Sequence, residues 1–312
     1  MRALRVLTET GPGDVVMQDV ADPEGELIVA VKAAALAFPD VLMTRGEYQI
    51  RQELPFTLGW EAAGEVLRAP EGSRFSPGDR VITMTFGSHA EQVAAVPVMT
   101  WPLPDGLSWA EGAALPLNSM TAVAALERRG RLVAGETVLI HGAAGGVGTA
   151  SIQVAKALGA TVIAAVSTDD KAAVARSLGA DQVVIGDDYR AQLEGPVDLI
   201  IDPVGGTEAF KESLRALRPE GRLVVVGFAS GEIPELRVNR LLLRNVDVCG
   251  CTFAALADTA AGFDGVMARL TELVATGAVK PLIGATYPAE QAVAALNEID
   301  ERRAKGKIVL TF

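Results

Sequence analysis

The stretch Ile140–Gly148 reads IHGAAGGVG, and an apolar run that begins at Thr137 leads into it. The dinucleotide-binding fingerprint places glycine at positions i, i+2 and i+5 between a strand and a helix, and here those positions hold Ala143, Gly145 and Gly148. Because Gly145 has no side chain, the backbone can approach a pyrophosphate there. Because Gly148 has none either, the helix can pack closely on the strand. The stretch therefore predicts a strand, a tight turn and a helix around a nucleotide site.

The helix after the turn is expected from about Gly146 to Leu158, because apolar side chains recur on one of its faces. Its first N–H groups, around Gly146 and Val147, and the positive end of its dipole favour the binding of phosphate. A glycine-rich triplet by itself is equally compatible with a tight turn in any parallel-sheet protein. The alternating elements around it favour the nucleotide site.

From about Glu111 onward, apolar strands alternate with helices of about 10 to 15 residues. Near-continuous apolar strands joined by helices predict a doubly wound parallel sheet that is covered on both faces, an α/β fold. The expected strands of this sheet are residues 137–141, 161–166, 182–185, 197–201 and 222–226, and one that starts at 246.

The first ~115 residues contain many short strand signals that are interrupted by proline and glycine, which predicts a partly closed β domain. The tail has two helical stretches, around 265–275 and 289–303, and a short strand at 307–310. We expect this tail to return to the first domain, which makes that domain discontinuous. The expected division is 1–118 with 256–312 for the β domain, and 119–255 for the parallel-sheet domain.

Charge and hydropathy exclude several classes of partner. The chain has 312 residues, with 28 Lys and Arg against 39 Asp and Glu, so its net charge is −11. An acidic chain without a basic block is a poor candidate for binding nucleic acid or anionic lipid. No apolar run approaches the roughly 18 residues of a membrane span, and Glu9 interrupts the N-terminal stretch before a signal-peptide core forms. We expect neither a nucleic-acid partner nor a membrane.

The chain has only two cysteines and two histidines. Cys249 and Cys251 are too close in sequence to form a disulfide framework, and with His89 and His141 they are too few for a His/Cys catalytic metal site. We therefore expect no metal and a reducing, cytoplasmic compartment. For His89 a structural role is favoured over one in lining a cleft, and for His141 a packing role is favoured.

Distinctive short motifs occur from one end of the chain to the other, at Phe38–Asp40, Arg45–Tyr48, Leu54–Gly59, Gly78–Val81, Gly135–Gly148 and Gly306–Leu310. Together they resemble the quinone oxidoreductase (zeta-crystallin-like) branch of the zinc-independent medium-chain dehydrogenase/reductase superfamily. The resemblance implies a GroES-like, partly closed β-barrel domain made from both chain ends, a Rossmann domain between them, and a substrate cleft at the domain boundary. It also implies NADPH-dependent reduction of quinones or other activated, α,β-unsaturated carbonyl compounds.

The position of a zinc ligand in related enzymes supports the metal-free interpretation. Zinc-containing relatives have a Gly-His-Glu motif there, whereas this chain has Gly59–Glu61 with Trp60 in the middle. A metal can contribute several kcal/mol to polarising a carbonyl. An acceptor that is already electron-poor needs less of that help, so hydrogen-bond donors can suffice.

Tyr48 occupies a position that, by the resemblance, lines the substrate cleft and donates a proton in related enoyl-thioester reductases. The alternative is an aromatic residue that only packs in a turn. The sequence departs from the pattern of the branch at two positions where the acceptor is expected to bind. Ala37 replaces an asparagine beside the nicotinamide, and Ser119 replaces an aromatic residue. Two alternative functions therefore stay open, a 2-enoyl-thioester reductase and a nucleotide-binding protein with a weakened active site.

The cofactor is expected to be NADPH. NAD-binding Rossmann sites carry Asp or Glu at the end of the second strand, and here that position is Val166. Ser167 can donate a hydrogen bond and Lys171 can supply positive charge, and the resemblance implies that this pair holds the 2′-phosphate. Two aspartates at 169–170 partly offset that charge, and Gly186 replaces a tyrosine that is common in the branch.

A homodimer is expected through the last strand of the parallel sheet. The run Val246–Phe253 is long and largely apolar, and at a sheet edge it would leave an open row of backbone groups. The resemblance implies that this strand pairs with its two-fold copy.

Overall fold

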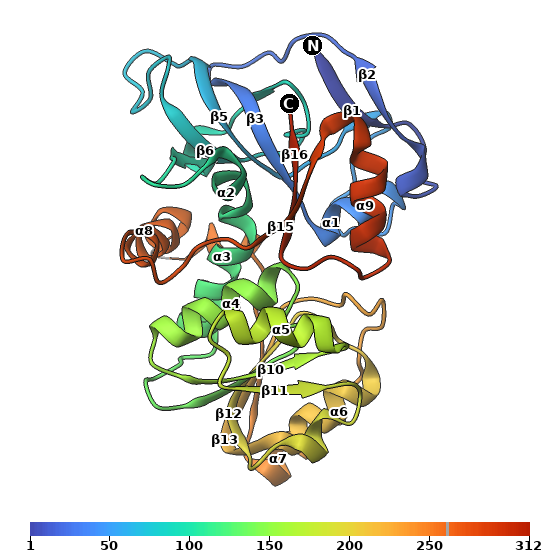
Figure 1. Ribbon diagram of the computed structural model, residues 1–312, viewed down its shortest axis with the longest axis vertical. Helices are drawn as coiled ribbons and strands as arrows, with labels where there is room; N and C mark the ends of the chain where they lie inside the picture. Colours follow the sequence, from blue (N-terminus) through green and yellow to red (C-terminus); the bar gives the residue numbers. More distant parts are fainter. Residues whose placement is uncertain (260–261) are drawn as a thin grey trace. The chain divides into compact units, whose positions relative to one another are not determined.

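The computed structural model describes residues 1–259 and 262–312, which form two compact units (Figure 1). Unit 1 consists of Met1–Leu117 with Pro281–Phe312, and unit 2 of Asn118–Lys280. The first boundary lies within one residue of the expected one. The second differs from the expected position between 255 and 256, because residues up to Lys280 belong to unit 2.

The helix α8, Gly262–Ala275, explains this difference. The Arg269 guanidinium donates to the Glu127 carboxylate at 2.8 Å, and the Lys280 N–H donates to the Gln153 side chain at 2.7 Å. These partners belong to unit 2, so α8 and the residues after it are held there.

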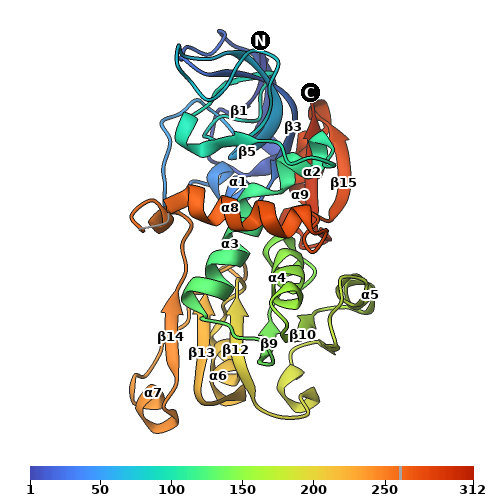
Figure 2. The ribbon, with the colours of Figure 1, turned by 90° about the vertical axis from the view of Figure 1, so that its left-hand side faces the viewer.

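Unit 2 contains a six-stranded parallel sheet with the order β11-β10-β9-β12-β13-β14. This is the Rossmann order, in which the direction of winding reverses between β9 and β12, and ligands bind outside the carboxyl ends of the strands at that point. Figure 2 shows several of these strands side by side. Their bounds are β9 Thr137–Ile140, β10 Thr161–Val166, β11 Gln182–Ile185, β12 Val197–Asp202, β13 Leu217–Val225 and β14 Asp247–Gly250.

The helices of unit 2 match the periodic segments of the sequence. Apolar residues of the strands, such as Leu139 and Ile200, are fully buried and cluster with Phe210 and Leu214 of a covering helix. Gly206 is the N-cap of that helix, and Thr207 is its first residue. The helices are α3 Pro116–Val123, which spans the unit boundary and continues as a π-helical segment Ala124–Arg129, α4 Gly146–Ala157, α5 Asp169–Ser177, α6 Thr207–Ala216, α7 Asn239–Arg244 and α8.

Unit 1 is built on two sheets. A seven-stranded sheet has the order β15-β16-β3-β5-β6-β8, with β7 paired to β3, and a three-stranded sheet has the order β2-β1-β4. The strands are β1 Arg2–Val6, β2 Val15–Asp19, β3 Ile28–Leu36, β4 Phe56–Thr57, β5 Glu61–Arg68, β6 Arg80–Met84, β7 Gln92–Ala94, β8 Thr100–Pro102, β15 Ile283–Pro288 and β16 Lys307–Thr311.

Of the tail, only the part from Pro281 onward returns to the first domain. Strand β16 lies beside β3 (Figure 1) and pairs with it antiparallel. Leu310 lies opposite Ala34 in this pairing. Leu4, Leu58 and Leu310 are buried in one core of this unit. The helices of unit 1 are α1 Phe38–Thr44, α2 Trp109–Ala114 and α9 Ala292–Asp300, and short 3-10 segments cover Pro12–Asp14, Pro97–Met99 and Ala289–Gln291.

Among the described residues, no helix combines the length and the apolar character that crossing a bilayer requires.

Candidate functional site

The glycine loop connects β9 to α4 in unit 2. Gly145 is the N-cap and α4 begins at Gly146. A Cβ atom on Gly148 would lie 2.2 Å from the carbonyl oxygen of Gly142 and 2.6 Å from the Cα of Ala143, so only glycine fits there. A Cβ atom on Gly145 would meet only the Gly142 oxygen, at 3.3 Å. Apart from that one close contact, no atom lies within 4 Å of the position that a Cβ atom would take at Gly145, which leaves room for a phosphate.

Some backbone N–H groups of this loop donate to carbonyl groups of the protein, and others are available to a ligand. The Ala143 N–H donates to the Ala165 carbonyl at 3.1 Å, and the Gly145 N–H donates to the Gly142 carbonyl at 2.9 Å. Ala143 is also fully buried, so it supports the loop by packing. The N–H groups at 146–148 open α4 and have no acceptor within the helix. These three donors and the helix dipole suit a diphosphate.

The end of β10 carries the second set of predicted residues. The strand ends at Val166, and no carboxylate occupies that position. Ser167 is exposed, and the Lys171 ammonium donates to the Ser167 hydroxyl at 3.2 Å. The N–H of Gly186 donates to the Val166 carbonyl at 2.9 Å. The structure thus brings a hydroxyl and a cation together beside the strand end, a combination that suits a phosphate.

His141 directly follows β9, at the start of the glycine loop. Its Nε2 lies 2.8 Å from the Ser213 hydroxyl, which in turn lies 2.9 Å from the hydroxyl of Tyr189. Burial lowers the pKa of His141, and the charge of Asp202 acts in the opposite direction. Because all of these side chains are buried, the Ser213–His141 contact is a packing contact rather than a nucleophile with its base.

Asp202 makes two turn hydrogen bonds at the end of β12. Its Oδ1 accepts from the N–H groups of Val204 and Gly205, both at 2.9 Å. Asp198 has a similar structural role, because its Oδ2 accepts from the Thr137 N–H at 2.8 Å.

Tyr48 lies in unit 1, in the segment after α1. Its ring packs edge-on against Trp60, with the centroids 5.7 Å apart, and Trp60 packs against Phe86. Its hydroxyl has no hydrogen-bond partner within the part of the chain that the structure describes. Burial and the negative charge of Asp40 raise the pKa of Tyr48. The phenol therefore holds its proton at neutral pH and can donate it.

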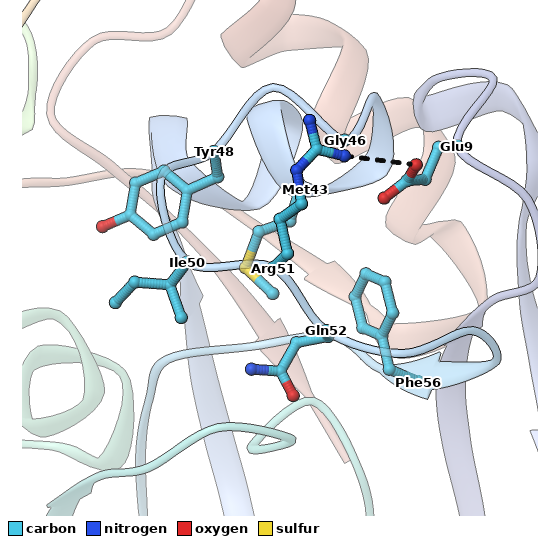
Figure 3. A pocket seen from close by; sticks show the side chains of 8 residues that line it. All are labelled: Glu9, Met43, Gly46, Tyr48, Ile50, Arg51, Gln52 and Phe56. Atoms are coloured by element: carbon cyan, nitrogen blue, oxygen red, sulfur yellow. Dashed lines mark ion pairs between the residues drawn. The ribbon is translucent and has the colours of Figure 1, made fainter.

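Tyr48 also borders a small recess of unit 1 (Figure 3). The empty space of the recess, open solvent included, is about 180 Å³, which is below the size of typical ligand pockets. Glu9 and Arg51 form an ion pair across it at 3.8 Å, and the Tyr48 hydroxyl points away from that pair. The recess is lined by Glu9, Met43, Gly46, Tyr48, Ile50, Arg51, Gln52 and Phe56.

In the segment Gly59–Glu61, the side chain of Trp60 packs against its neighbours and that of Glu61 forms an ion pair. The Trp60 indole N–H donates to the Met43 sulfur at 3.2 Å. Glu61 is fully buried, and its carboxylate accepts from the Lys307 ammonium at 2.6 Å and from the Leu117 N–H at 2.8 Å. Within the described residues, no group of three or more His, Cys, Asp or Glu side chains is arranged to hold a metal.

Two buried titratable residues of unit 1 were not singled out as site residues from the sequence. Asp40 is completely buried, and burial raises its pKa to about 7. The signal that could have found it is its place three residues after Ala37, where an acidic residue caps a helix start. His89 is also completely buried, its Nε2 lies 3.3 Å from the Ala35 carbonyl, and burial lowers its pKa to about 4.

The two residues that depart from the pattern of the branch, Ala37 and Ser119, are both buried. Ala37 is the N-cap of α1 and is 7% exposed, and Ser119 lies in α3 and is 2% exposed.

A GroES-like unit made from both chain ends and a Rossmann unit with a dinucleotide loop are the two parts of a medium-chain dehydrogenase/reductase. Comparisons with known proteins agree. The family model for the alcohol dehydrogenase GroES-like domain matches residues 23–118, and the model for zinc-binding dehydrogenase matches residues 146–272.

Individual relatives narrow the family. Quinone oxidoreductase-like protein 2 of Bos taurus is 37% identical, over 92% of this chain and 85% of that protein. Acryloyl-coenzyme A reductase of Metallosphaera sedula is 30% identical, over 95% of this chain and 96% of that protein. The solved structure of mycobacterial Rv1454c complexed with NADPH superposes with a TM-score of 0.93 at 30% identity, with full coverage of both chains.

The chain belongs to the quinone oxidoreductase branch of the medium-chain dehydrogenase/reductase superfamily. It is an oxidoreductase.

Proposed function

We propose that this enzyme transfers a hydride from NADPH to a quinone or another α,β-unsaturated carbonyl acceptor, without zinc. The observation that carries the proposal is the Ser167–Lys171 pair at the end of β10, beside a glycine loop that fits a diphosphate and without a carboxylate at Val166. The names of the bovine relative and of the NADPH complex of Rv1454c support it.

Each group has a separate role in this proposal. The N–H groups at 146–148 hold the diphosphate, and Ser167 and Lys171 hold the 2′-phosphate. NADPH, when bound, supplies the hydride. Tyr48 hydrogen-bonds the acceptor oxygen and delivers a proton, because burial keeps its phenol protonated. An electron-poor acceptor needs no Lewis acid for this step.

The direct test is NADPH oxidation over panels of quinones, enones and enoyl thioesters, with and without a metal chelator. We expect turnover of a quinone or simple enone that survives chelation. Loss of turnover on removal of stoichiometric zinc would contradict the zinc-free proposal. Tight NADPH binding without turnover of any acceptor would favour a nucleotide-binding protein with a weakened site.

A 2-enoyl-thioester reductase is the second candidate function, favoured by the similarity to the acryloyl-coenzyme A reductase. The same panel separates the two candidates. A kcat/KM for an enoyl thioester well above that for every quinone would replace the quinone proposal with this one.

Lys171→Ala is expected to raise the Kd for NADPH about tenfold, which is the loss of one charge-assisted hydrogen bond to the 2′-phosphate. The Kd for NADH should change little, because NADH lacks that phosphate. Both constants can be measured by quenching of protein fluorescence or by calorimetry. The control is Lys211→Ala, which removes a lysine of α6 that pairs with Glu208. Equal weakening of both cofactors would show that the Ser167–Lys171 assignment is wrong.

Tyr48→Phe is expected to lower kcat about a hundredfold while the Kd for NADPH stays nearly constant, because the hydroxyl acts at the acceptor. Steady-state kinetics with the preferred acceptor and a separate binding titration measure the two effects. Tyr287→Phe is the matched control, since its hydroxyl donates to Glu298 on the surface of the same unit. Unchanged turnover would leave Tyr48 as a packing residue.

A homodimer through Val246–Phe253 is part of the proposal. Strand β14 is an edge strand of the unit 2 sheet, since it pairs only with β13 among the described strands. In the segment before β14, Ile233, Val238, Leu242 and Leu243 are 70% to 81% exposed. An exposed edge next to large apolar side chains is suited to a second copy of the same chain.

The expected dimer can be tested by sedimentation at micromolar concentration. The Leu242→Asp/Leu243→Asp variant should be monomeric, because it places charge on the apolar segment. Val98→Asp is the control, because Val98 is 58% exposed in unit 1. A monomeric wild type would refute the dimer.

We also propose a cytoplasmic location. Cys249 and Cys251 are both free thiols in the structure, as a reducing compartment would keep them.

A further inference from the structure

Three aromatic side chains of unit 1, Tyr48, Trp60 and Phe86, form one group that we call the aromatic cluster. Trp60 contacts both of the others. Its ring centroid lies 5.7 Å from that of Tyr48, with the ring planes at 79°, and 3.8 Å from that of Phe86, with the planes at 50°. All three residues are partly exposed, in a chain with only 5% aromatic residues. The cluster therefore gathers aromatic surface at one place that a ligand can reach.

Trp60 is fixed in place by its backbone and by its side chain. The Thr85 N–H donates to the Trp60 carbonyl at 2.9 Å. Gly59, the preceding residue, has a φ of 114°, and a Cβ atom on it would lie 2.5 Å from the backbone nitrogen of His89, so the close approach requires glycine. The indole N–H donates to the Met43 sulfur at 3.2 Å. A side chain that is held in this way before a ligand binds loses little conformational freedom on binding.

The polar groups of the cluster differ in what they leave for a ligand. Because the indole N–H of Trp60 is used within the protein, Trp60 offers only aromatic surface. The hydroxyl of Tyr48, in contrast, has no hydrogen-bond partner among the residues that the structure describes, and it can donate to an oxygen. A ligand that suits both groups has a flat aromatic ring with an oxygen acceptor at its rim. A quinone has this form, whereas an acyclic enone or an enoyl thioester has the oxygen without the ring.

We propose that Trp60 is a specificity-determining residue, whose indole packs against the flat ring of a quinone while the Tyr48 hydroxyl donates to a quinone oxygen. The proposal rests on the proposed function, in which Tyr48 acts at the acceptor. Aromatic rings attract one another in offset-stacked and in edge-to-face arrangements, beyond the effect of the area they bury. The aromatic cluster therefore favours a fused aromatic quinone over an acyclic acceptor.

Tryptophan fluorescence tests the contact without any turnover. The chain has three tryptophans, Trp60, Trp101 and Trp109. The Trp101→Phe/Trp109→Phe variant retains only Trp60. The matched control, Trp60→Phe/Trp101→Phe, retains only Trp109, whose ring lies 4.4 Å from the Arg80 guanidinium. The probe is a naphthoquinone with methyl groups on both free positions of its quinone ring, which prevents addition of the cysteine thiols, and it is titrated without NADPH.

The emission of Trp60 should fall by more than half and reach a plateau, because a quinone in contact with an excited indole accepts an electron from it. The emission of Trp109 should fall only slightly, in proportion to the quinone concentration. Absorption of light by the quinone is the same in both samples, so the difference between them reports the contact. Quenching of Trp60 that is no greater than that of Trp109 would overturn the proposal.

Acceptor selectivity tests the consequence for the reaction. Trp60→Leu should lower kcat/KM for the same quinone about tenfold, mainly through KM, and leave kcat/KM for an acyclic pentenone nearly unchanged. Trp60→Phe keeps a flat ring and should retain most of the activity with the quinone, and the control Trp109→Phe should change neither constant. An equal loss with both acceptors would overturn the proposal, since a structural disturbance of Tyr48 has that effect.

The two experiments separate the specificity proposal from the proposed function. Absence of turnover with every acceptor would refute the proposed function, while the fluorescence titration would still decide whether a quinone binds against Trp60. The titration also decides if Trp60→Leu does not fold, because the protein that it follows retains Trp60.

Discussion

Gly148→Ala is expected to weaken NADPH binding by about a hundredfold and to destabilise unit 2 by about 1–3 kcal/mol. The added Cβ atom would lie 2.2 Å from the Gly142 carbonyl oxygen and 2.6 Å from the Ala143 Cα. Both are backbone atoms of the loop that presents the phosphate donors, so α4 cannot keep its distance from β9. The helix start and the loop must separate, and the three N–H groups lose their common direction.

Two matched substitutions separate this effect from a general loss of glycine. Gly145→Ala should disturb the fold far less than Gly148→Ala, because its Cβ atom meets only the Gly142 oxygen, at 3.3 Å, but it should still weaken NADPH binding by filling the cradle. Gly195→Ala, where a Cβ atom meets nothing within 4 Å, should change neither property. Chemical denaturation and cofactor titration provide the measurements. Wild-type NADPH binding in Gly148→Ala would show that the loop is not the diphosphate site.

Lys307→Met should lower the free energy of unfolding by about 3–5 kcal/mol, because it leaves the Glu61 carboxylate buried without its counter-charge. The two side chains are 4% and 0% exposed and lie 2.6 Å apart. They join β16 to β5 within unit 1, so the loss should appear in the unfolding of that unit.

The double variant Glu61→Gln/Lys307→Met is the decisive control. A glutamine oxygen can still accept from the Leu117 N–H, and no buried charge is left. This variant should recover most of the lost stability, since replacing a buried ion pair as a whole is often neutral. If the double variant is as unstable as Lys307→Met, the loss comes from packing of the lysine chain rather than from the unpaired carboxylate.

The parallel-sheet unit was predictable because its signals are local. The fingerprint at Ala143–Gly148 and the spacing of Ser167 and Lys171 by one helical turn depend only on neighbouring residues, and in the structure each set lies together. Strand β13 is longer than predicted, because it begins at Leu217 rather than at residue 222. Its pairing with β12 has a register irregularity there, and Glu220 has a φ of 64°. Such a deviation leaves no periodic pattern in the sequence.

The features missed from the sequence depend on contacts between distant residues. Glu61 and Lys307 are 246 positions apart, and nothing around either residue indicates its partner. The burial of Asp40 depends on strands that come from both ends of the chain. The position of α8 was mistaken for a related reason, because an amphipathic helix shows which of its faces is buried but not which unit buries it.

Strand β16 belongs to unit 1, although the whole of unit 2 precedes it in the chain. During translation, unit 2 has all of its residues, through Lys280, before the last strand of unit 1 has been synthesised. Until then the Ala33–Leu36 part of β3 lacks the neighbour that β16 provides and presents an open edge to the surroundings of the ribosome, whereas Ile28–Ala30 can already pair with β7. The part of the chain that is made first is therefore the part that finishes folding last, and a chaperone that shields the nascent β3 edge would act on unit 1 rather than on unit 2.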